Sequence, residues 1–212
     1  MLALLGMPLA VRPVQVAEER LAGEAPQDMV VRLSIAKAQS VVVKPGHDVV
    51  VGSDTAVSLV VGDETLVLGK PRDREEVQQM LEILCGREHT VYTGYAVWDA
   101  QKGQLISGFE AVVVSLRSLT ERELLAYIES GIGDDKAGAY AIQDRAFALV
   151  EAVHGCAAAA MGLPLCAVRQ VTLDWGLPVA SLAETVAGCQ RLTGMACSLQ
   201  LSERCLDTAG NG

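Results

Sequence analysis

Two long runs of β-branched and aromatic residues constrain the fold of this chain more than any other feature of its sequence. Residues 89–99 and 104–117 are rich in Val, Tyr and Thr, and a short polar turn at 100–103 separates them. Runs of this composition on either side of a glycine-containing turn are typical of a β-hairpin. We therefore expect two long strands that pair antiparallel.

A second hairpin is expected earlier in the chain. From Val49 the residues are β-branched and alternate, a Gly-Asp pair at 62–63 favours a turn, and residues 65–68 return as a short strand. Asp54 lies within or near the first of these strands. Two further strands are expected over residues 7–16 and 147–153.

Helix signals alternate with these strands along the chain. Apolar residues at a 3.6-residue spacing predict a helix over 26–40, and an amphipathic run opened by Asp73 predicts a second helix that ends near Gly86. Two more helices are predicted by Ser/Thr-x-x-Glu capping boxes, which are Thr120 with Glu123 and Ser181 with Glu184. Because the elements follow no regular βαβ series, we expect an α+β protein or an α/β protein with a mixed sheet.

Composition and charge exclude several classes of protein. Half of the 212 residues are hydrophobic and 20% are charged, which indicates a globular chain rather than a disordered one. The formal net charge is −9 and the basic residues are scattered, so neither a nucleic-acid polymer nor an anionic membrane surface is an expected partner. A small polyanion such as a nucleotide is still compatible, because a few lysines and a bridging metal can bind it on an acidic protein.

The cysteines, the histidines and the apolar N-terminus add further expectations. The six cysteines include no C-x-x-C pair and the three histidines lie far apart, so no zinc site is expected, and reduced thiols in a cytoplasmic protein are favoured. Residues 1–10 lack the basic start of a secretory signal and are interrupted by Pro8. We interpret this segment as the end of a helix closed by Gly6, and we expect that something preceded it.

Acidic and basic side chains at the edges of the expected elements are the candidates for chemistry. The sequence has no G-x-S-x-G nucleophile elbow and no glycine-rich phosphate-binding motif. Asp54 lies between apolar residues, where an unpaired carboxylate is costly to bury, so a metal or a lysine partner is expected. Carboxylates and lysines around a divalent ion are what a triphosphate requires. The candidates are Glu18, Glu19, Lys37, Asp54, Lys70, Asp135 and Lys136.

Five segments in order resemble the Maf family of nucleoside triphosphate pyrophosphatases, also called septum formation proteins. The resemblance spans residues 1–170, and it implies a mixed α/β fold. The sheet that it implies is elongated, largely antiparallel and flanked by helices, with a cleft between two lobes, as in inosine triphosphate pyrophosphatases. The segments are Gly52-Ser53-Asp54-Thr55, Leu68-Gly69-Lys70-Pro71, residues 80–94, residues 135–143 from Asp135 to Gln143, and Gly162-Leu163-Pro164-Leu165.

The resemblance also implies an activity and the residues that perform it. The expected reaction is hydrolysis of a nucleoside triphosphate to the monophosphate and pyrophosphate with Mg²⁺ or Mn²⁺, in nucleotide pool sanitation or in the arrest of cell division. Asp54 matches the family's proton acceptor, and Glu19, with Glu18 as its less certain neighbour, matches the second acid that holds the metal. Lys37 and Lys70 match lysines that neutralise the phosphates.

Base preference is implied by two further matches. Thr55 and Gln143 resemble the branch of the family that acts on dTTP and UTP, and Lys136 lies in the matched loop and is expected to bind substrate. A Gln amide both donates and accepts, which suits the imide edge of a pyrimidine. An ordinary strand threonine is the alternative for Thr55.

The sequence departs from the family pattern at several places, which leaves a second function open. The first strand and a Ser-x-x-Arg-Arg loop expected of the family are missing, residues 155–161 lack the usual Ser, Tyr and Asn, and residues 171–212 carry no readable motif. We therefore expect a pyrophosphatase domain over 1–170 followed by an extension over 171–212. The alternative function is a catalytically weak nucleotide-binding regulator of septum formation. A homodimer is common in similar proteins.

Overall fold

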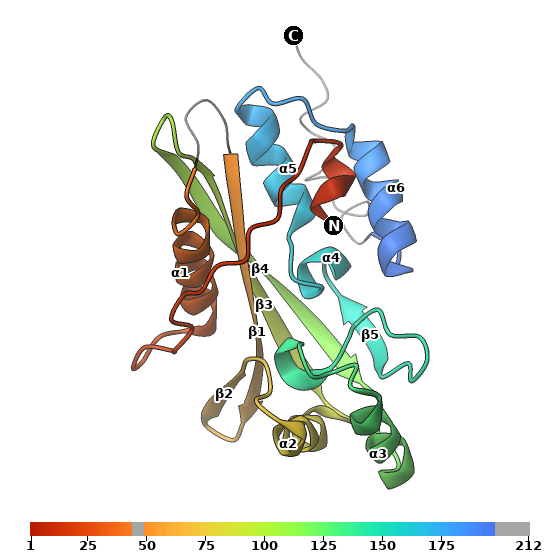
Figure 1. Cartoon of the computed structure of the whole chain (residues 1–212). Helices are drawn as coiled ribbons and strands as arrows, with labels where there is room; N and C mark the ends of the chain where they lie inside the picture. The colour runs from red at the N-terminus through yellow and green to blue at the C-terminus, as the bar shows by residue number, and fades with distance from the viewer. Residues whose placement is uncertain (44–48, 198–212) are drawn as a thin grey trace.

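A single antiparallel sheet forms the centre of the computed structural model, which describes residues 1–43 and 49–197 (Figure 1). Every neighbouring pair of strands is antiparallel, in the order β2-β1-β3-β4-β5. The expected fold class, a mixed α/β protein with a largely antiparallel sheet, is confirmed. The strands are β1 (Val49–Val61), β2 (Glu64–Leu68), β3 (Glu88–Asp99), β4 (Gln104–Leu116) and β5 (Val150–His154).

Both predicted hairpins are present. β3 and β4 pair along their whole length, from Glu88 opposite Ser115 to Asp99 opposite Gln104. β1 pairs with β3 from its first residue, whereas its pairing with β2 begins only at Val57. The first half of β1, which contains Asp54, therefore pairs with β3 alone within the part of the chain that the structure describes.

The helices flank this sheet, and four of them were predicted. The capping boxes at Thr120 and Ser181 are both present, and the Asp73 side chain accepts a hydrogen bond from the backbone of Glu76. α4 and α5 were not predicted. The helices are α1 (Pro26–Gln39), α2 (Arg74–Leu84), α3 (Glu121–Ser130), α4 (Ala157–Ala160), α5 (Leu165–Asp174) and α6 (Leu182–Thr193), with 3-10 turns η1 (Leu2–Leu5) and η2 (Ala137–Ala139).

Helix α1 packs directly on the sheet because two strand residues facing it have no side chain. A Cβ atom on Gly52 of β1 would lie 2.2 Å from the Ser34 carbonyl oxygen, and one on Gly94 of β3 would lie 2.3 Å from the Val30 carbonyl oxygen. Contacts this short are sterically impossible, so both positions require glycine at this helix–sheet distance. The close approach brings the last turn of α1 beside β1.

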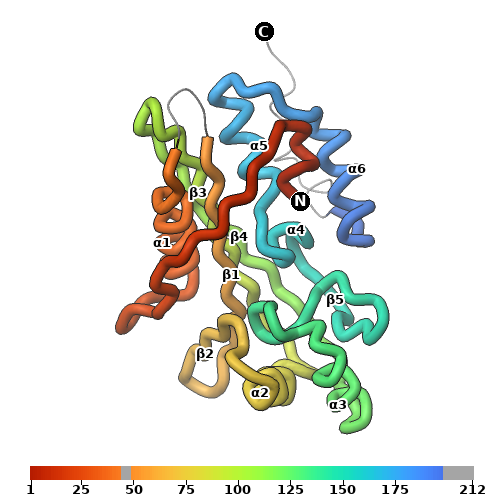
Figure 2. The backbone as a smooth tube through the Cα atoms, in the orientation of Figure 1, coloured from red at the N-terminus to blue at the C-terminus, as the bar shows by residue number. Residues whose placement is uncertain are grey.

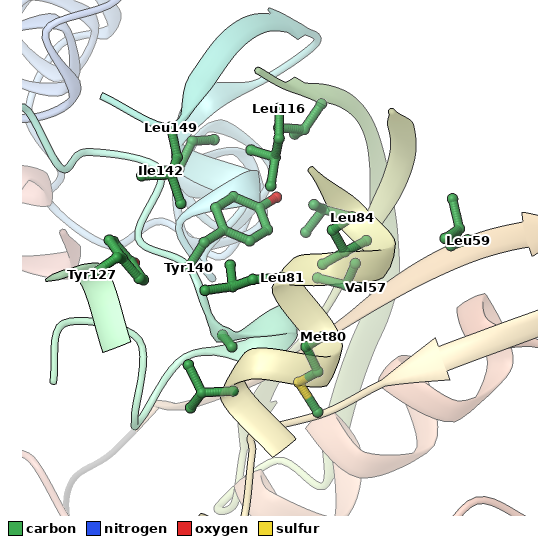
Figure 3. Packing of buried hydrophobic residues seen from close by; sticks show 14 of the residues in the cluster. Val57, Leu59, Met80, Leu81, Leu84, Leu116, Tyr127, Tyr140, Ile142 and Leu149 are labelled. Atoms are coloured by element: carbon green, nitrogen blue, oxygen red, sulfur yellow. The ribbon is translucent and has the colours of Figure 1, made fainter. Parts of the chain in front are cut away.

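The opposite face of the sheet is covered by two clusters of buried apolar residues. In the first, Leu81 and Leu84 of α2 pack around Tyr140 and Val57 (Figure 3). The second joins η1, α4 and α5 to β3 through residues such as Leu5, Val97 and Val168. These clusters fix the loop around Tyr140 and the segment of α4 against the same strands that carry the predicted site.

Two local predictions about strands were wrong. Residues 7–16 form no strand, because Pro8 and Pro13 interrupt the loose apolar alternation and lack the N–H groups that a sheet needs. The last strand begins at Val150 rather than at Phe147, since the carbonyl oxygen of Phe147 accepts a hydrogen bond from the Arg117 side chain instead. The helical turn closed by Gly6 is confirmed, with φ of 74° at that residue.

Residues 171–197 pack against the beginning of the chain (Figure 2). α5 extends across position 170, and the backbone N–H of Ala180 donates to the Leu5 carbonyl oxygen at 2.9 Å. The division into a domain over 1–170 and an extension over 171–212 remains a prediction, and residues 198–212, with Cys205, lie outside the described part. None of the described helices is long and apolar enough to cross a membrane.

Candidate active site

A cavity of about 480 Å³ lies at the first half of β1 and gathers residues from distant parts of the sequence. Its lining comes from α1, from β1, from the connection after β2, from the loop after α3 and from the segment that follows α4. Seven residues were given a role by the resemblance, and all of them except Glu19 line it: Lys37, Asp54, Thr55, Lys70, Lys136 and Gln143.

The charged part of this cavity is a chain of two ion pairs centred on Lys37. Its ammonium nitrogen lies 2.5 Å from Oδ1 of Asp54 and 2.7 Å from Oε1 of Glu18. The Asp54 side chain is only 9% exposed, whereas that of Glu18 is 53% exposed. The lysine partner that a buried Asp54 was expected to need is therefore Lys37, supplied by the last turn of α1.

Burial and charge act in opposite directions on this pair. Burial raises the pKa of Asp54 above its usual value, and the ammonium of Lys37 opposes that rise. Burial also tends to lower the pKa of Lys37, but its hydrogen bonds to Asp54 and Glu18 outweigh that effect and raise the pKa overall. At neutral pH Lys37 is therefore firmly protonated, and the Asp54 carboxylate accepts a proton more readily than an exposed aspartate does.

Glu19, predicted as the second acid, does not line the cavity, and its neighbour Glu18 does. Glu19 is exposed, and its backbone carbonyl oxygen accepts a hydrogen bond from Arg32 at 3.1 Å. The segment forms neither helix nor strand, and only one of its two adjacent glutamates lines the cavity. Sequence spacing alone does not show which of two adjacent glutamates faces a site.

Two loops that carry lysines are joined to each other beside the cavity. The N–H of Gly138 donates to the carbonyl oxygen of Gly69, next to Lys70, at 3.0 Å. Gly138 has φ of 70°, and a Cβ atom there would lie 2.8 Å from a methyl group of Val57. Only glycine therefore allows the loop with Lys136 to pack this close to β1. Lys136 also forms an ion pair with the adjacent Asp135.

Gln143 is held on a turn that two buried tyrosines support. The hydroxyl of Tyr127 accepts a hydrogen bond from the N–H of Ala141 at 3.2 Å. The hydroxyl of Tyr140 lies 2.7 Å from Nε2 of His89, and the two rings meet edge to face. The Gln143 side chain remains exposed while the backbone on its N-terminal side is anchored in the core.

Neutral hydroxyls lie on the other side of the cavity, where Ser53 and Thr55 line it and Thr93 is buried. Oγ of Ser53 lies 2.7 Å from the Gly94 carbonyl oxygen and 2.8 Å from that of Gly162. Oγ1 of Thr55 lies 3.0 Å from Oγ1 of Thr93, which donates to the Ala159 carbonyl oxygen at 2.8 Å. Sequence reasoning missed Thr93, and only knowledge that β1 and β3 pair at Thr55 and Thr93 would have found it.

The donor set fits a divalent cation only together with a ligand. Among residues 1–43 and 49–197, no group of three or more His, Cys, Asp or Glu side chains is arranged to hold a metal ion. Mg²⁺ is commonly bound by one or two protein carboxylates, with substrate phosphates and waters completing its shell. Asp54 and Glu18 supply two such carboxylates. The cavity therefore combines a buried carboxylate, a second carboxylate and three lysines, a donor set that suits a small phosphorylated ligand.

Comparison with known proteins assigns the family. The model of the Maf-like protein family matches residues 1–174, and the chain belongs to that family. A dTTP/UTP pyrophosphatase of Geotalea uraniireducens (strain Rf4) is 41% identical over 153 residues, covering 72% of this chain and 77% of the relative. Those of Syntrophotalea carbinolica and Pelotomaculum thermopropionicum are 41% and 38% identical, covering 79% and 82% of this chain and 76% and 90% of the relatives.

Proposed function

We propose that this protein hydrolyses nucleoside triphosphates, dTTP and UTP in particular, to the nucleoside monophosphate and pyrophosphate. The observation that carries the proposal is the placement of Asp54, which is almost fully buried in a cavity that three lysines also line. The names of the relatives, dTTP/UTP pyrophosphatases, support the same activity. The lysines are Lys37, Lys70 and Lys136.

The lysines bind and neutralise the triphosphate. An ammonium group has three protons to donate, and in Lys37 two of them are directed to Asp54 and Glu18. The third is available for a phosphate oxygen. Lys70 and Lys136 add two further positive charges from the joined loops, where negative charge builds up on the leaving pyrophosphate.

Asp54 is the general base. Because Lys37 contacts Oδ1, the other carboxylate oxygen, Oδ2, is the one that takes a proton from water. The water oxygen then forms a bond to the α-phosphorus, the bond from that phosphorus to the bridging oxygen breaks, and pyrophosphate leaves. Burial raises the pKa of Asp54, which makes it a stronger base for this transfer, and Lys37 keeps it ionised at neutral pH.

A divalent cation, Mg²⁺ or Mn²⁺, is the proposed cofactor. Asp54 and Glu18 would hold it together with the phosphates, and we propose Glu18 in place of Glu19 because Glu18 lines the cavity. Such an ion supplies charge neutralisation on the phosphates when bound. Thr55 and Gln143 are proposed to contact the base.

A substrate panel tests the proposal. Pyrophosphate release would be measured with dTTP, UTP, CTP, dATP and GTP, with Mg²⁺, with Mn²⁺ and after chelation. We expect selective release from dTTP and UTP that requires the cation. Absence of release from every triphosphate by folded protein would contradict the proposal and favour a nucleotide-binding regulator instead.

The biological setting is a further part of the proposal. Hydrolysis of these triphosphates fits control of the nucleotide pool in the cytoplasm, and a role in septum formation rests on the family resemblance alone. A homodimer is proposed on the same basis. Sedimentation of the purified chain would decide between a monomer and a dimer.

A further inference from the structure

We infer that Thr93 determines which pyrimidine the site accepts, because it fixes Thr55 as a hydrogen-bond acceptor. The inference rests on the proposed function only in that the ligand is a pyrimidine nucleotide. It concerns three groups that we call the hydroxyl chain: Oγ1 of Thr55, Oγ1 of Thr93 and the carbonyl oxygen of Ala159.

The direction of the hydrogen bonds in the hydroxyl chain follows from counting protons. Two oxygens 2.8 Å apart need a hydrogen between them, and a carbonyl has none, so Thr93 must donate to Ala159. A hydroxyl has a single proton. The second contact, 3.0 Å from Thr55 to Thr93, therefore requires that Thr55 donates. The proton of Thr55 is thus engaged, and only its lone pairs remain for a ligand.

The surroundings prevent the hydroxyl chain from reversing. Thr93 is fully buried on β3, and its backbone pairs with Thr55 in the sheet. The carbonyl oxygen of Ala159 also accepts the N–H of Gly162 at 2.7 Å, which holds it in place after α4. Ser53 contacts the carbonyl oxygen of Gly162 from the strand side. Strand and loop are therefore connected at two points around Thr55.

Access to Thr55 from the cavity depends on a glycine. Thr55 is half-buried and lines the cavity, as does Gly162. A Cβ atom on Gly162 would lie 3.4 Å from Oγ1 of Thr55, the one neighbouring atom that it would meet within 4 Å. The glycine thus leaves open the space in front of the hydroxyl where a ligand group can approach.

A hydroxyl that can only accept a hydrogen bond distinguishes uracil and thymine from cytosine. These pyrimidine rings have the same size, but N3 of uracil or thymine carries a proton, whereas N3 of cytosine is an acceptor at neutral pH. Gln143 cannot make this distinction alone, because its amide can turn to present either oxygen or NH₂. Thr55, held by the hydroxyl chain, accepts from an imide N3–H and places lone pair against lone pair when cytosine binds.

The test compares Thr93→Val with Thr93→Ser and with Thr90→Val. Valine keeps the shape of threonine but removes the hydroxyl, and Ala159 keeps its bond from Gly162, so the fold should persist. The proton of Thr55 is then free to turn toward cytosine. Thr93→Ser retains the hydroxyl chain, and Thr90→Val makes the same exchange on the same strand away from the cavity, at a residue that does not line it. The readout is the affinity for the α,β-imido analogues of UTP and CTP with Mg²⁺, and kcat/KM for UTP and CTP.

We expect Thr93→Val to reduce the ratio of UTP to CTP affinity about tenfold, the value of one hydrogen bond, with the other two variants near wild type. A merely structural role would weaken both analogues equally and leave the ratio unchanged, which would overturn the inference. A preference for the UTP analogue that Thr93→Val loses, in protein that releases no pyrophosphate, would refute the proposed hydrolysis while supporting the hydroxyl chain. Equal binding of both analogues by wild type would overturn the inference whatever the activity.

Discussion

The two sides of the cavity are built by adjacent residues of one strand, yet they differ in chemistry. Asp54 meets the ammonium of Lys37, whereas Thr55 meets the hydroxyl of Thr93. Successive strand residues point to opposite faces of a sheet. One face of β1 is therefore covered by α1 and carries charge, and the other is covered by the segment after α4 and carries neutral hydrogen bonds.

This difference separates reaction from selection. On the charged side a raised pKa at Asp54 and nearby lysines serve a proton transfer and a polyanion. On the neutral side, groups whose role as hydrogen-bond donor or acceptor is fixed serve recognition of the base, because a charged group there would bind any phosphate. Changes on the charged side should therefore affect turnover, and changes on the neutral side should affect substrate choice or stability.

The largest effect is expected from Asp54→Asn. The exchange keeps the shape of the side chain but removes the proton acceptor, so kcat for UTP should fall about a thousandfold. The matched control is Asp99→Asn, another buried aspartate, which accepts backbone hydrogen bonds from Gln101 and Lys102 away from the cavity. Thermal unfolding of both variants would check that the fold persists. A kcat near wild type for Asp54→Asn would remove this residue from its proposed role.

Acid pH should lower the stability of the protein through His89, which lies on the same face of β3 as Thr93, on the neutral side. The side chain is 4% exposed, its Nδ1 has no hydrogen-bond partner in the described part, and burial lowers its pKa from 6.5 to about 4. Between pH 6.5 and pH 4 the imidazole of His89 is protonated in the unfolded chain but stays neutral in the folded chain. The free energy of unfolding should thus fall by about 3 kcal/mol as the pH drops from 6.5 to 4.

Urea unfolding across this pH range measures the effect. In His89→Gln the part of the pH dependence of the free energy of unfolding that is due to His89 should disappear. In His154→Gln, which changes an exposed histidine, this part should persist. An identical slope in His89→Gln and wild type would show that other groups control the acid sensitivity.

How far the sequence predicts this architecture depends on whether a signal is local. The capping boxes at Thr120 and Ser181 act within one helical turn, and both were recognised. Helix α5 was not predicted, although Pro164 gives it a start signal and Leu165 and Val168 give it an apolar spacing. Local signals are therefore sufficient for most elements.

The site is built from residues that lie far apart in the sequence, so its prediction was less complete than that of the helices and strands. Lys37, Asp54 and Lys70 were proposed from the resemblance, and all three line one cavity. The position of Glu18 rather than Glu19 depends on how an irregular segment crosses α1, and the contact of Thr93 depends on strand register. Neither is encoded by residues that are close in the sequence.

A smaller effect is expected where α1 reaches the charged side. Gly94→Ala places a methyl group 2.3 Å from the Val30 carbonyl oxygen, so α1 must move away from the sheet, at a cost of about 2 kcal/mol in stability. Gly69→Ala is the control, since no neighbouring atom lies within 4 Å of the added carbon. Urea midpoints compare the two. Equal stability would mean that α1 tolerates displacement, and Lys37 would then not depend on the glycine.

The smallest effect distinguishes the two adjacent glutamates. Glu18→Gln removes one of the two carboxylates that face Lys37, and with it a proposed ligand of the cation. The Mn²⁺ concentration that gives half-maximal pyrophosphate release should rise about tenfold, the value of one interaction with a charged group. Glu19→Gln, at an exposed residue outside the cavity, should leave it unchanged. The reverse result would show that Glu19, not Glu18, is the ligand of the cation. The segment before α1 would then have to change conformation when substrate binds, so that Glu19 faces the cavity.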